Sequence, residues 1–247
     1  MSDDALRGKV ILVTGAGSGL GEATARAFAG AGCAVACVDV NGAAAERVSG
    51  ALTAQDARSL AIRGDVRDAD TVFGAVETAV REFGRLDVVV NNAAVDHTLS
   101  VAELSIEQWD QVIGVNLRAP FLFAKAALPH LQRQGGGHIV NVASTAGTRA
   151  WANASAYHAS KWGLIGFSRA LGVEGRPHGI CVTTIIPGGM RTHFFDRFAE
   201  QGIPMPDMAS LQDPANVAEV ILFAVRMPAG SALQEVIVTP PNETSWP

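Results

Sequence analysis

The sequence predicts an α/β protein, built as a single domain around a doubly wound parallel sheet of seven strands. Short apolar runs rich in β-branched residues alternate with longer stretches that have helical spacing. The runs are apolar at nearly every position, which is typical of strands covered on both faces by crossover helices. A chain of 247 residues fits within one such domain, so we expect residues 1–247 to share one core.

Seven runs are predicted to form the strands, and each of the first six is followed by a helical stretch. Gly84, the glycine run 135–137 and the segment 177–179 are predicted to end helices, because a helix end often needs a left-handed backbone. In chain order, the expected strands are residues 9–14, 34–39, 59–62, 86–91, 138–143, 181–186 and 235–238.

Composition narrows the classes of function. The 19 basic and 24 acidic side chains give a formal charge of −5 without a basic cluster, which argues against a nucleic-acid partner. No apolar run approaches the ~20 residues of a membrane span, and the first residues lack the order of a secretory signal. We therefore expect a cytoplasmic protein with no membrane partner. Cys33, Cys37 and Cys181 show no metal-ligand spacing, so we expect buried free thiols and no metal.

A glycine-rich loop, TGAGSGLG at residues 14–21, follows the first predicted strand. Glycines let the backbone turn sharply and approach a pyrophosphate, whose charge is stabilised by the start of the next helix. The spacing is G-x-x-x-G-x-G rather than G-x-G-x-x-G, but a plain strand-to-helix turn would need only one or two glycines. The loop predicts a Rossmann dinucleotide-binding domain, with cofactor contacts from Gly15, Gly17, Ser18, Gly19, Leu20 and Gly21.

Asp39 ends the second predicted strand, at the distance from the loop where an acid can accept hydrogen bonds from the adenosine ribose. Its carboxylate would repel the extra phosphate of NADP, and neither the loop nor Val40 and Asn41 offers an arginine to bind that phosphate. The sequence therefore predicts NAD. The alternative is that Asp39 only ends a strand in a turn.

Other strands are also followed by polar or glycine-containing segments. Asp65 and Val66 follow the third strand, residues 91–94 the fourth, Ser144 the fifth and residues 187–189 the sixth. The carboxyl ends of parallel strands lie along one edge of the sheet, where open α/β sheets bind ligands. We predict that these segments meet at one site.

Tyr157 and Lys161 lie four residues apart in a helix predicted to begin near Asn153, which places both on one face. An ammonium beside a phenol lowers the phenol pKa from its usual ~10, so Tyr157 is a candidate general acid and base. Taken alone, such a pair is usually a surface pair. Support comes from Ser144 and Asn116, polar residues in apolar surroundings, although a helix cap or a local backbone bond would also account for them.

These landmarks together resemble the short-chain dehydrogenase/reductase family, from Gly8 to about Val238. The resemblance implies an alcohol dehydrogenase or ketoreductase in which Tyr157 is the general acid and base and Ser144 binds the substrate oxygen, and Asp39 makes NAD its expected cofactor. Lys161 would hold the nicotinamide ribose and lower the tyrosine pKa. Asn116 would complete a water-linked proton path to Lys161.

The resemblance also implies further cofactor contacts and an assembly. Asp65 and Val66 would contact the adenine, and Thr192 would hold the carboxamide of the nicotinamide. A homotetramer is implied, joined through the long helices that carry Trp109 and Trp162. The remaining contacts would come from Asn91 and Ala93, which brace the sheet edge against the cofactor, and from Pro187 and Gly188.

Two features depart from the family pattern. Ala94 stands where the family usually has glycine, which leaves less room at the cofactor or the active-site wall. The usual glycine-rich ending is replaced by TPPNETSWP at residues 239–247, which resembles a branch that acts on small hydroxy acids and often uses NADP. We give the charge of Asp39 more weight and keep NAD.

The substrate pocket is predicted to be mainly apolar, which favours a secondary alcohol or ketone, including hydroxyacyl compounds, over a polyol. Residues 190–210 are irregular, and we expect them to form a lid. Lone His97 and His193 are more often surface residues than catalysts. The pocket candidates are Val95, Asp96, His97, Thr145, Ala146, Trp151, Gly189 and Met190, and the lid adds Phe194, Phe195, Phe198, Met205 and Met208.

Two other functions stay open. An NAD-dependent epimerase also uses a Tyr-x-x-x-Lys pair, but such chains are longer and carry a substrate domain. An NAD-binding regulatory sensor without turnover would have no need of Ser144, Tyr157 and Lys161, which are all present.

Overall fold

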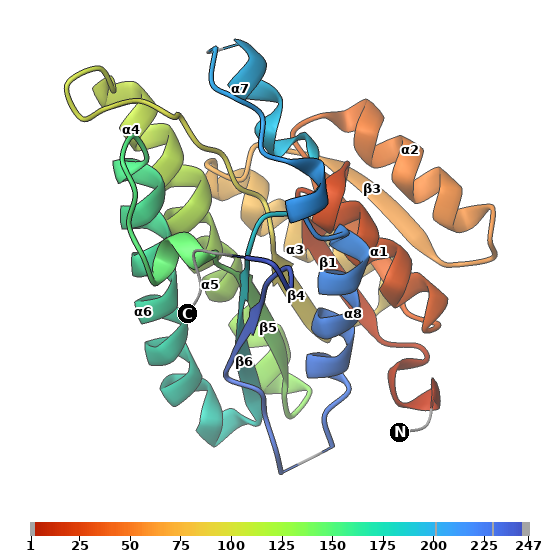
Figure 1. The fold of residues 1–247 in the computed structure, drawn as a ribbon. Helices are drawn as coiled ribbons and strands as arrows, with labels where there is room; N and C mark the ends of the chain where they lie inside the picture. Colours follow the sequence, from red (N-terminus) through yellow and green to blue (C-terminus); the bar gives the residue numbers. More distant parts are fainter. Residues whose placement is uncertain (1–2, 201, 229, 244–247) are drawn as a thin grey trace.

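The computed structural model describes residues 3–200, 202–228 and 230–243, and its centre is a seven-stranded sheet (Figure 1). All neighbouring strands are parallel, in the order β3-β2-β1-β4-β5-β6-β7. The predicted doubly wound sheet is confirmed, and every strand lies within two residues of its expected bounds. The strands are β1 (Val10–Thr14), β2 (Ala34–Asp39), β3 (Ser59–Arg63), β4 (Val88–Asn91), β5 (Gly137–Val142), β6 (Ile180–Pro187) and β7 (Glu235–Val238).

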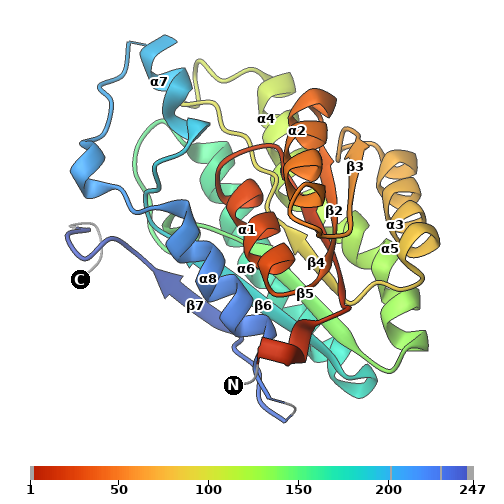
Figure 2. The same cartoon turned by 90° about the vertical axis from the view of Figure 1, so that its right-hand side faces the viewer.

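Helices cover both faces of the sheet (Figures 1 and 2). One face carries α1 (Gly19–Gly30), α2 (Gly42–Thr53) and α8 (Pro214–Val225). The other carries α3 (Ala69–Phe83), α5 (Ala119–Arg133) and α6 (Ser155–Gly175), and α4 (Ile106–Ile113) packs on α6. A short helix, α7 (Asp196–Glu200), lies above the carboxyl edge of the sheet.

The two core clusters explain why the strands are apolar throughout. In β1, Val10 and Leu12 join the cluster under α3 and α5, whereas Ile11 and Val13 join the cluster under α1 and α8. Successive side chains of a strand point to opposite faces, so a sheet covered twice needs apolar residues at every position.

Glycines end the helices where the sequence predicts it. Gly84, after α3, and Gly135, after α5, both have φ of +85°, and Gly179, which precedes β6, has φ of +68°. These left-handed conformations let the chain leave a helix and enter a strand within a few residues.

Helices α4 and α5 form one long rod, joined by a π-helical turn at Gly114–Arg118. The rod is long and apolar enough to cross a membrane by length and composition, but 56% of its most apolar window is buried inside the protein. Contacts of α4 with α6 and of α5 with α3 and β4 account for its apolar residues.

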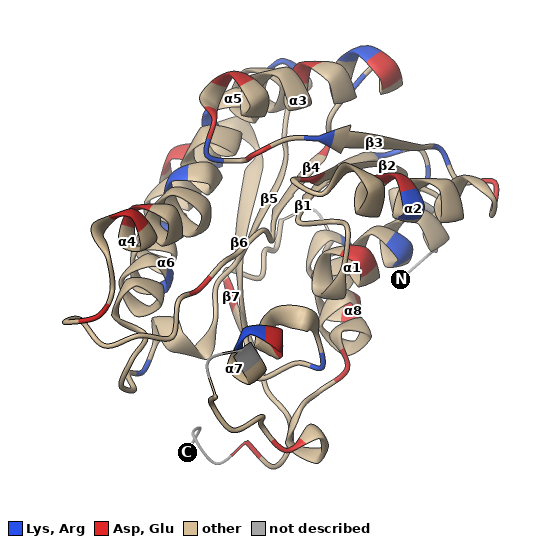
Figure 3. Cartoon of the chain, turned by 90° about the horizontal axis from the view of Figure 1, so that it is seen from above, with Lys and Arg blue, Asp and Glu red and all other residues tan. Residues whose placement is uncertain are grey.

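Charged residues fall mainly on the helices, the loops and the strand ends, and the middle of the ribbon of the sheet carries none of their colours (Figure 3). All three cysteines are free thiols, as expected, although Cys181 is half-buried rather than buried. Burial raises the pKa of Cys33 to about 12 and that of Cys37 to about 11. In the described part of the chain, no three His, Cys, Asp or Glu side chains form a group that could hold a metal ion.

Candidate active site

A cavity of about 600 Å³ opens at the carboxyl ends of the strands and extends from the glycine loop to Tyr157. The predicted edge segments meet here. The predicted site residues that line it are Gly15, Ser18, Gly19, Leu20, Asp39, Asp65, Val66, Ala93, Ser144, Tyr157, Lys161, Pro187, Gly188 and Thr192. Gly17, Gly21, Asn91 and Asn116 belong to the structure around the cavity rather than to its lining.

The glycine loop requires its glycines for close packing. Gly15 has φ of +64° and Gly19 has φ of +53°, conformations that residues with a Cβ rarely adopt. A Cβ on Gly17 would lie 2.8 Å from Oδ2 of Asp39, and a Cβ on Gly21 would overlap the carbonyl oxygen of Gly15. The loop therefore holds α1 against the end of β1, with the amino end of α1 facing the cavity.

Asp39 is held by main-chain donors. Its Oδ2 accepts a hydrogen bond from the N–H of Gly17 at 2.8 Å, and its Oδ1 accepts one from the N–H of Asn41 at 2.9 Å. The strand-end interpretation is thus correct as well, and the side chain still lines the cavity.

The structure adds a cation near Asp39 that sequence reasoning missed. Arg47, on α2, donates to the carbonyl oxygen of Gly17 at 2.9 Å. Its guanidinium also pairs with Glu22, at 2.5 Å to Oε2, and this pairing lowers the pKa of Glu22. Glu22 also pairs with Arg26 at 2.7 Å, so the charge of Arg47 is only partly compensated within the protein.

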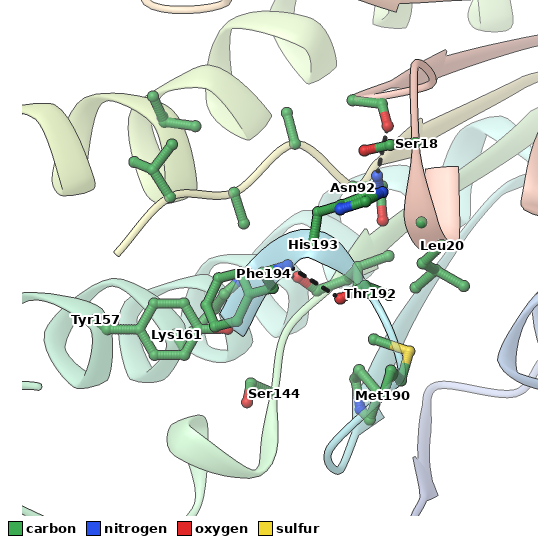
Figure 4. A pocket seen from close by; sticks show the side chains of 18 of the residues that line it. Ser18, Leu20, Asn92, Ser144, Tyr157, Lys161, Met190, Thr192, His193 and Phe194 are labelled. Carbon is green, nitrogen blue, oxygen red and sulfur yellow. Dashed lines mark hydrogen bonds between the residues drawn. The ribbon is translucent and has the colours of Figure 1, made fainter. Parts of the chain in front are cut away.

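Tyr157 and Lys161 share the first turns of α6, as their spacing predicts (Figure 4). The tyrosine is 9% exposed and the lysine 2%, so the surface-pair alternative is wrong. Nζ of Lys161 donates to the carbonyl oxygen of Val142 at 2.8 Å and lies 5.5 Å from the centre of the Tyr157 ring.

The electrostatics of this pair differ from expectation. Burial raises the pKa of Tyr157 to about 12, and the side-chain hydrogen bond with Ser144 acts in the opposite direction. Burial lowers the pKa of Lys161 to about 7. Burial is the largest cause of both shifts, and Lys161 is not among the causes of the shift at Tyr157.

Asn116 braces the site from the π-helical turn. Its Oδ1 accepts from the N–H of Val95, and its Nδ2 donates to the carbonyl oxygen of Val95 and to Oγ of Ser160, at 2.9 to 3.1 Å. Ser160 in turn donates to the carbonyl oxygen of Tyr157 at 2.7 Å. The Asn116 amide thus links the loop after β4 to α6. Its hydrogen bonds lead to Ser160 rather than to Lys161.

Asn91 lies inside the sheet. Its Nδ2 donates to Oδ1 of Asn141 on the neighbouring strand at 2.8 Å, and Nδ2 of Asn141 donates to Ser168 of α6. The cavity wall is formed instead by Asn92 and Ala93, whose N–H groups both donate to Oγ1 of Thr14. Asn91 therefore braces the sheet. Asn92 and Ala93 are the residues of this segment that can contact a ligand in the cavity.

The segment 190–210, predicted to form a lid, contributes side chains to the cavity wall. Thr192, His193, Phe194 and Phe195 line the cavity, and the ring of Phe194 lies 5.5 Å from that of Tyr157 (Figure 4). Phe198 packs on Phe195 behind this wall. Met205 and Met208 are exposed and lie outside the cavity lining, because residues 202–208 turn away from it.

Most of the pocket candidates reach the cavity. Val95, Thr145, Trp151, Gly189 and Met190 line it, as does Ala94. Asp96 pairs with Arg197, His97 is hydrogen-bonded to Gln111, and Ala146 is fully buried, so these three lie behind the wall.

His158 and Glu243 are also contributors to the site that were not predicted from the sequence. His158, next to Tyr157, bridges the carbonyl oxygen of Ala146 and the N–H of Trp151, and so fixes the segment that carries Trp151. Glu243 lines the cavity from the C-terminal tail, near Gly188. The unusual tail thus reaches the site, although residues 244–247 lie outside the described part. Its polar, proline-rich sequence carried no signal of this contact.

Comparison with known proteins shows matches over most of the chain. The family model described as short chain dehydrogenase matches residues 9–202. D-threitol dehydrogenase of Mycolicibacterium smegmatis is 41% identical over 185 residues, 75% of this chain and 71% of that protein. Cyclohexanol dehydrogenase of an Acinetobacter species is 37% identical over 217 residues, 87% of this chain and 86% of that protein.

Solved structures agree with the sequence matches. The 3-ketoacyl-(acyl-carrier-protein) reductase from Brucella melitensis, complexed with NADH, superposes with a TM-score of 0.84 at 33% identity, covering 96% of this chain and 98% of that chain. Two other solved matches are complexed with NADP and with 5-hydroxy-NADP.

Proposed function

This chain belongs to the short-chain dehydrogenase/reductase family of oxidoreductases, and we propose that it transfers hydride between NAD(H) and a secondary alcohol or its ketone. The observation that carries the proposal is the single cavity lined by both the glycine loop and the pair of Tyr157 and Lys161. The glycine loop and the amino end of α1 line one end of this cavity, which is the arrangement that a pyrophosphate needs, so the residues present fit a dinucleotide.

NAD rather than NADP is supported by the charges beside the glycine loop. Asp39 presents a carboxylate where NADP would place a phosphate, and the main-chain bonds from Gly17 and Asn41 hold it there. Arg47 is a nearby cation, and its guanidinium is engaged by the carbonyl oxygen of Gly17 and by Glu22, which it shares with Arg26. Solved relatives are complexed with NADP or with NADH, so our choice of NAD depends on these local charges.

Tyr157 is proposed to move the proton of the substrate hydroxyl. A bound nicotinamide supplies or accepts the hydride. With a pKa raised by burial, the phenol keeps its proton at neutral pH and can donate it to the oxygen of a ketone. Ser144 shares a hydrogen bond with Tyr157 and is placed to hold the same oxygen, while Lys161 presents its amine beneath the phenol.

The substrate is proposed to be a mainly apolar secondary alcohol, such as a small cyclic one. Val95, Trp151, Met190 and Phe194 supply the apolar wall in front of Tyr157. The cyclohexanol dehydrogenase of Acinetobacter supports a ring-shaped substrate, and the D-threitol dehydrogenase makes a polyol the alternative. Residues 190–210 are proposed to act as a lid over it.

A homo-oligomer, commonly a tetramer in this family, is proposed through the face formed by α4, α5 and α6. Trp109, Phe121, Trp162 and Val173 lie on these helices and are exposed in the single chain. Large exposed apolar side chains on neighbouring helices favour contact with a second copy. Sedimentation should report an assembly that Trp162→Glu dissociates.

One assay tests the function. Cyclohexanol, D-threitol and open-chain secondary alcohols, with the matching ketones, are offered with NAD(H) and NADP(H) in parallel, and absorbance at about 340 nm is followed. Turnover of an apolar alcohol with NAD is the expected result. A fluorescence change of NADH without conversion of any substrate would favour the regulatory sensor instead.

A further inference from the structure

Arg197, on α7, ties the lid to the loop that follows β4, which lies 101 residues earlier in the chain. Its Nη2 donates to Oδ2 of Asp96 at 2.7 Å, and its Nε donates to Oγ1 of Thr98 at 3.2 Å. The side chain of Arg197 is 18% exposed and that of Asp96 only 5%. The pair is shielded from water, so it is stronger than a typical surface ion pair.

Asp96 depends on this guanidinium. Its Oδ1 is buried, and it has no hydrogen-bond partner among the described residues. A buried carboxylate without compensation is costly, so removal of Arg197 would leave an unpaired charge that favours displacement of the Asp96 side chain. The loop after β4 therefore holds α7 firmly in place.

The same guanidinium organises the aromatic side chains of the lid. Its central carbon lies 4.2 Å from the centre of the Phe194 ring and 5.0 Å from that of Phe198. It also donates to the carbonyl oxygen of Phe194. Phe194 is in turn the aromatic neighbour of Tyr157 (Figure 4). A continuous chain of contacts thus runs from Asp96 through Arg197 and Phe194 to the phenol.

We propose that Arg197 is a positioning residue for Tyr157, which it serves by holding Phe194 against the phenol, with Asp96 as its anchor. The proposal rests on the proposed function, since the position of the phenol matters for catalysis only if Tyr157 moves the proton. We call Asp96, Arg197 and Phe194 together the clamp. Phe194 also lines the cavity, so the clamp sets the space in front of the phenol and hence the shape of alcohol that fits.

A matched control lies in the same segment. Arg191 donates to the carbonyl oxygen of Leu211 at 2.7 Å and pairs with Asp213 at 3.5 Å. These bonds hold the base of the lid to the segment before α8, away from Tyr157. General loosening of the lid should follow from Arg191→Met as well, whereas an effect on the phenol should follow only from Arg197→Met.

The experiment uses the fact that Tyr157 is the only tyrosine in the chain. Incorporation of 3-fluorotyrosine therefore gives one fluorine signal, which reports the surroundings of the Tyr157 ring in the full-length protein. We expect Arg197→Met to move this signal and to lower kcat/KM for a small secondary alcohol roughly 10-fold, since a displaced reacting group slows the chemical step. Arg191→Met should leave the signal in place.

Two further variants keep the test decisive if Arg197→Met does not fold. Asp96→Asn keeps the guanidinium over the rings but weakens its anchor, so a smaller shift in the same direction is expected. In a Phe194→Leu background, Asp96→Asn should then cause no further loss of kcat/KM, because the clamp acts through the phenylalanine.

The clamp is overturned if the fluorine signal stays unchanged in Arg197→Met, or if Arg191→Met moves it equally. Additive losses in the Phe194→Leu background would also overturn it. Because the fluorine signal is read without turnover, these outcomes are distinct from a failure to find any alcohol that the protein oxidises.

Discussion

The wall at the glycine-loop end of the cavity is largely main chain, whereas the wall at the lid end is made of side chains. At the first end, Asp39 is held by N–H groups, and β1 and β2 are paired residue by residue up to Thr14 and Val38. At the second end, Phe194 is placed by an arginine whose anchor lies in another loop.

This difference teaches how one fold can keep its cofactor and change its substrate. The glycine-loop wall tolerates little change, because an added Cβ at Gly15 or Gly21 meets backbone atoms that cannot move away. Side-chain walls can be rebuilt by substitutions that leave the sheet intact. Variants at the glycine-loop end should therefore change cofactor binding, whereas variants at the lid end should change turnover.

Tyr157→Phe should cause the largest loss of turnover. The effect should be confined to the lid end of the cavity. Removal of the hydroxyl takes away the proton donor and keeps the ring that contacts Phe194, so turnover should fall about 10²- to 10⁴-fold. Titration of NADH fluorescence should show nearly unchanged cofactor affinity. Substantial turnover by this variant would contradict the proposed mechanism.

Lys161→Met should change how stability depends on pH. The pKa of Lys161 is about 7 in the folded protein and near 10.5 when unfolded, so between these values the unfolded chain binds the extra proton. The free energy of unfolding of the parent should therefore rise relative to the variant as pH increases from about 7 to 10.5, and the cost of the buried charge should be complete below about 7.

Denaturant titrations of both proteins across this range provide the measurement. A constant difference between parent and variant would show that the ammonium is not destabilised by burial. The same result would show that burial of charged side chains does not distinguish the lid end of the cavity from the glycine-loop end.

Gly21→Ala should damage the glycine-loop end alone. The new Cβ would overlap the carbonyl oxygen of Gly15, so α1 must shift, at an expected cost of about 1–3 kcal/mol and with weaker NADH binding. Gly50→Ala on α2 is the control, because nothing lies within 4 Å of its added Cβ. That variant should be as stable as the parent or slightly more stable by thermal unfolding.

Asp39→Ser should have the smallest effect, a change of cofactor preference without loss of fold. Loss of the carboxylate removes both ribose acceptors and the repulsion of a phosphate, so the ratio of kcat/KM for NAD over NADP should fall about 10-fold. Adding Glu22→Gln, which releases Arg47, should lower the ratio further. An unchanged ratio would show that selection between the cofactors lies elsewhere.

The elements that were predicted correctly are those whose structure depends on residues close to one another in the sequence. A strand buried on both faces must be apolar at each residue, and a loop packed against Asp39 must contain glycine, so both leave a pattern in neighbouring residues. Tyr157 and Lys161 were identified in the same way, because four residues of helix bring them to one face.

Features that depend on distant segments left no such pattern. Asp96 lies in an irregular loop and Arg197 in the short helix α7, and nothing in either segment specifies the other. Glu243 reaches the cavity only because the chain returns over Gly188 after β7. The raised pKa of Tyr157 was also not predictable, since it depends on how deeply the whole fold buries the ring.

The π-helical turn at Gly114–Arg118 changes the rotational phase of the rod that runs from Ile106 to Arg133. One extra residue advances an α-helix by about 100°, so the part after the turn presents a different side from the part before it. The first part can then face α6 while the second faces α3 and β4. A deletion of one residue here would preserve composition and length within a single residue, yet it would rotate α5 out of register with the sheet and carry Asn116 away from Val95.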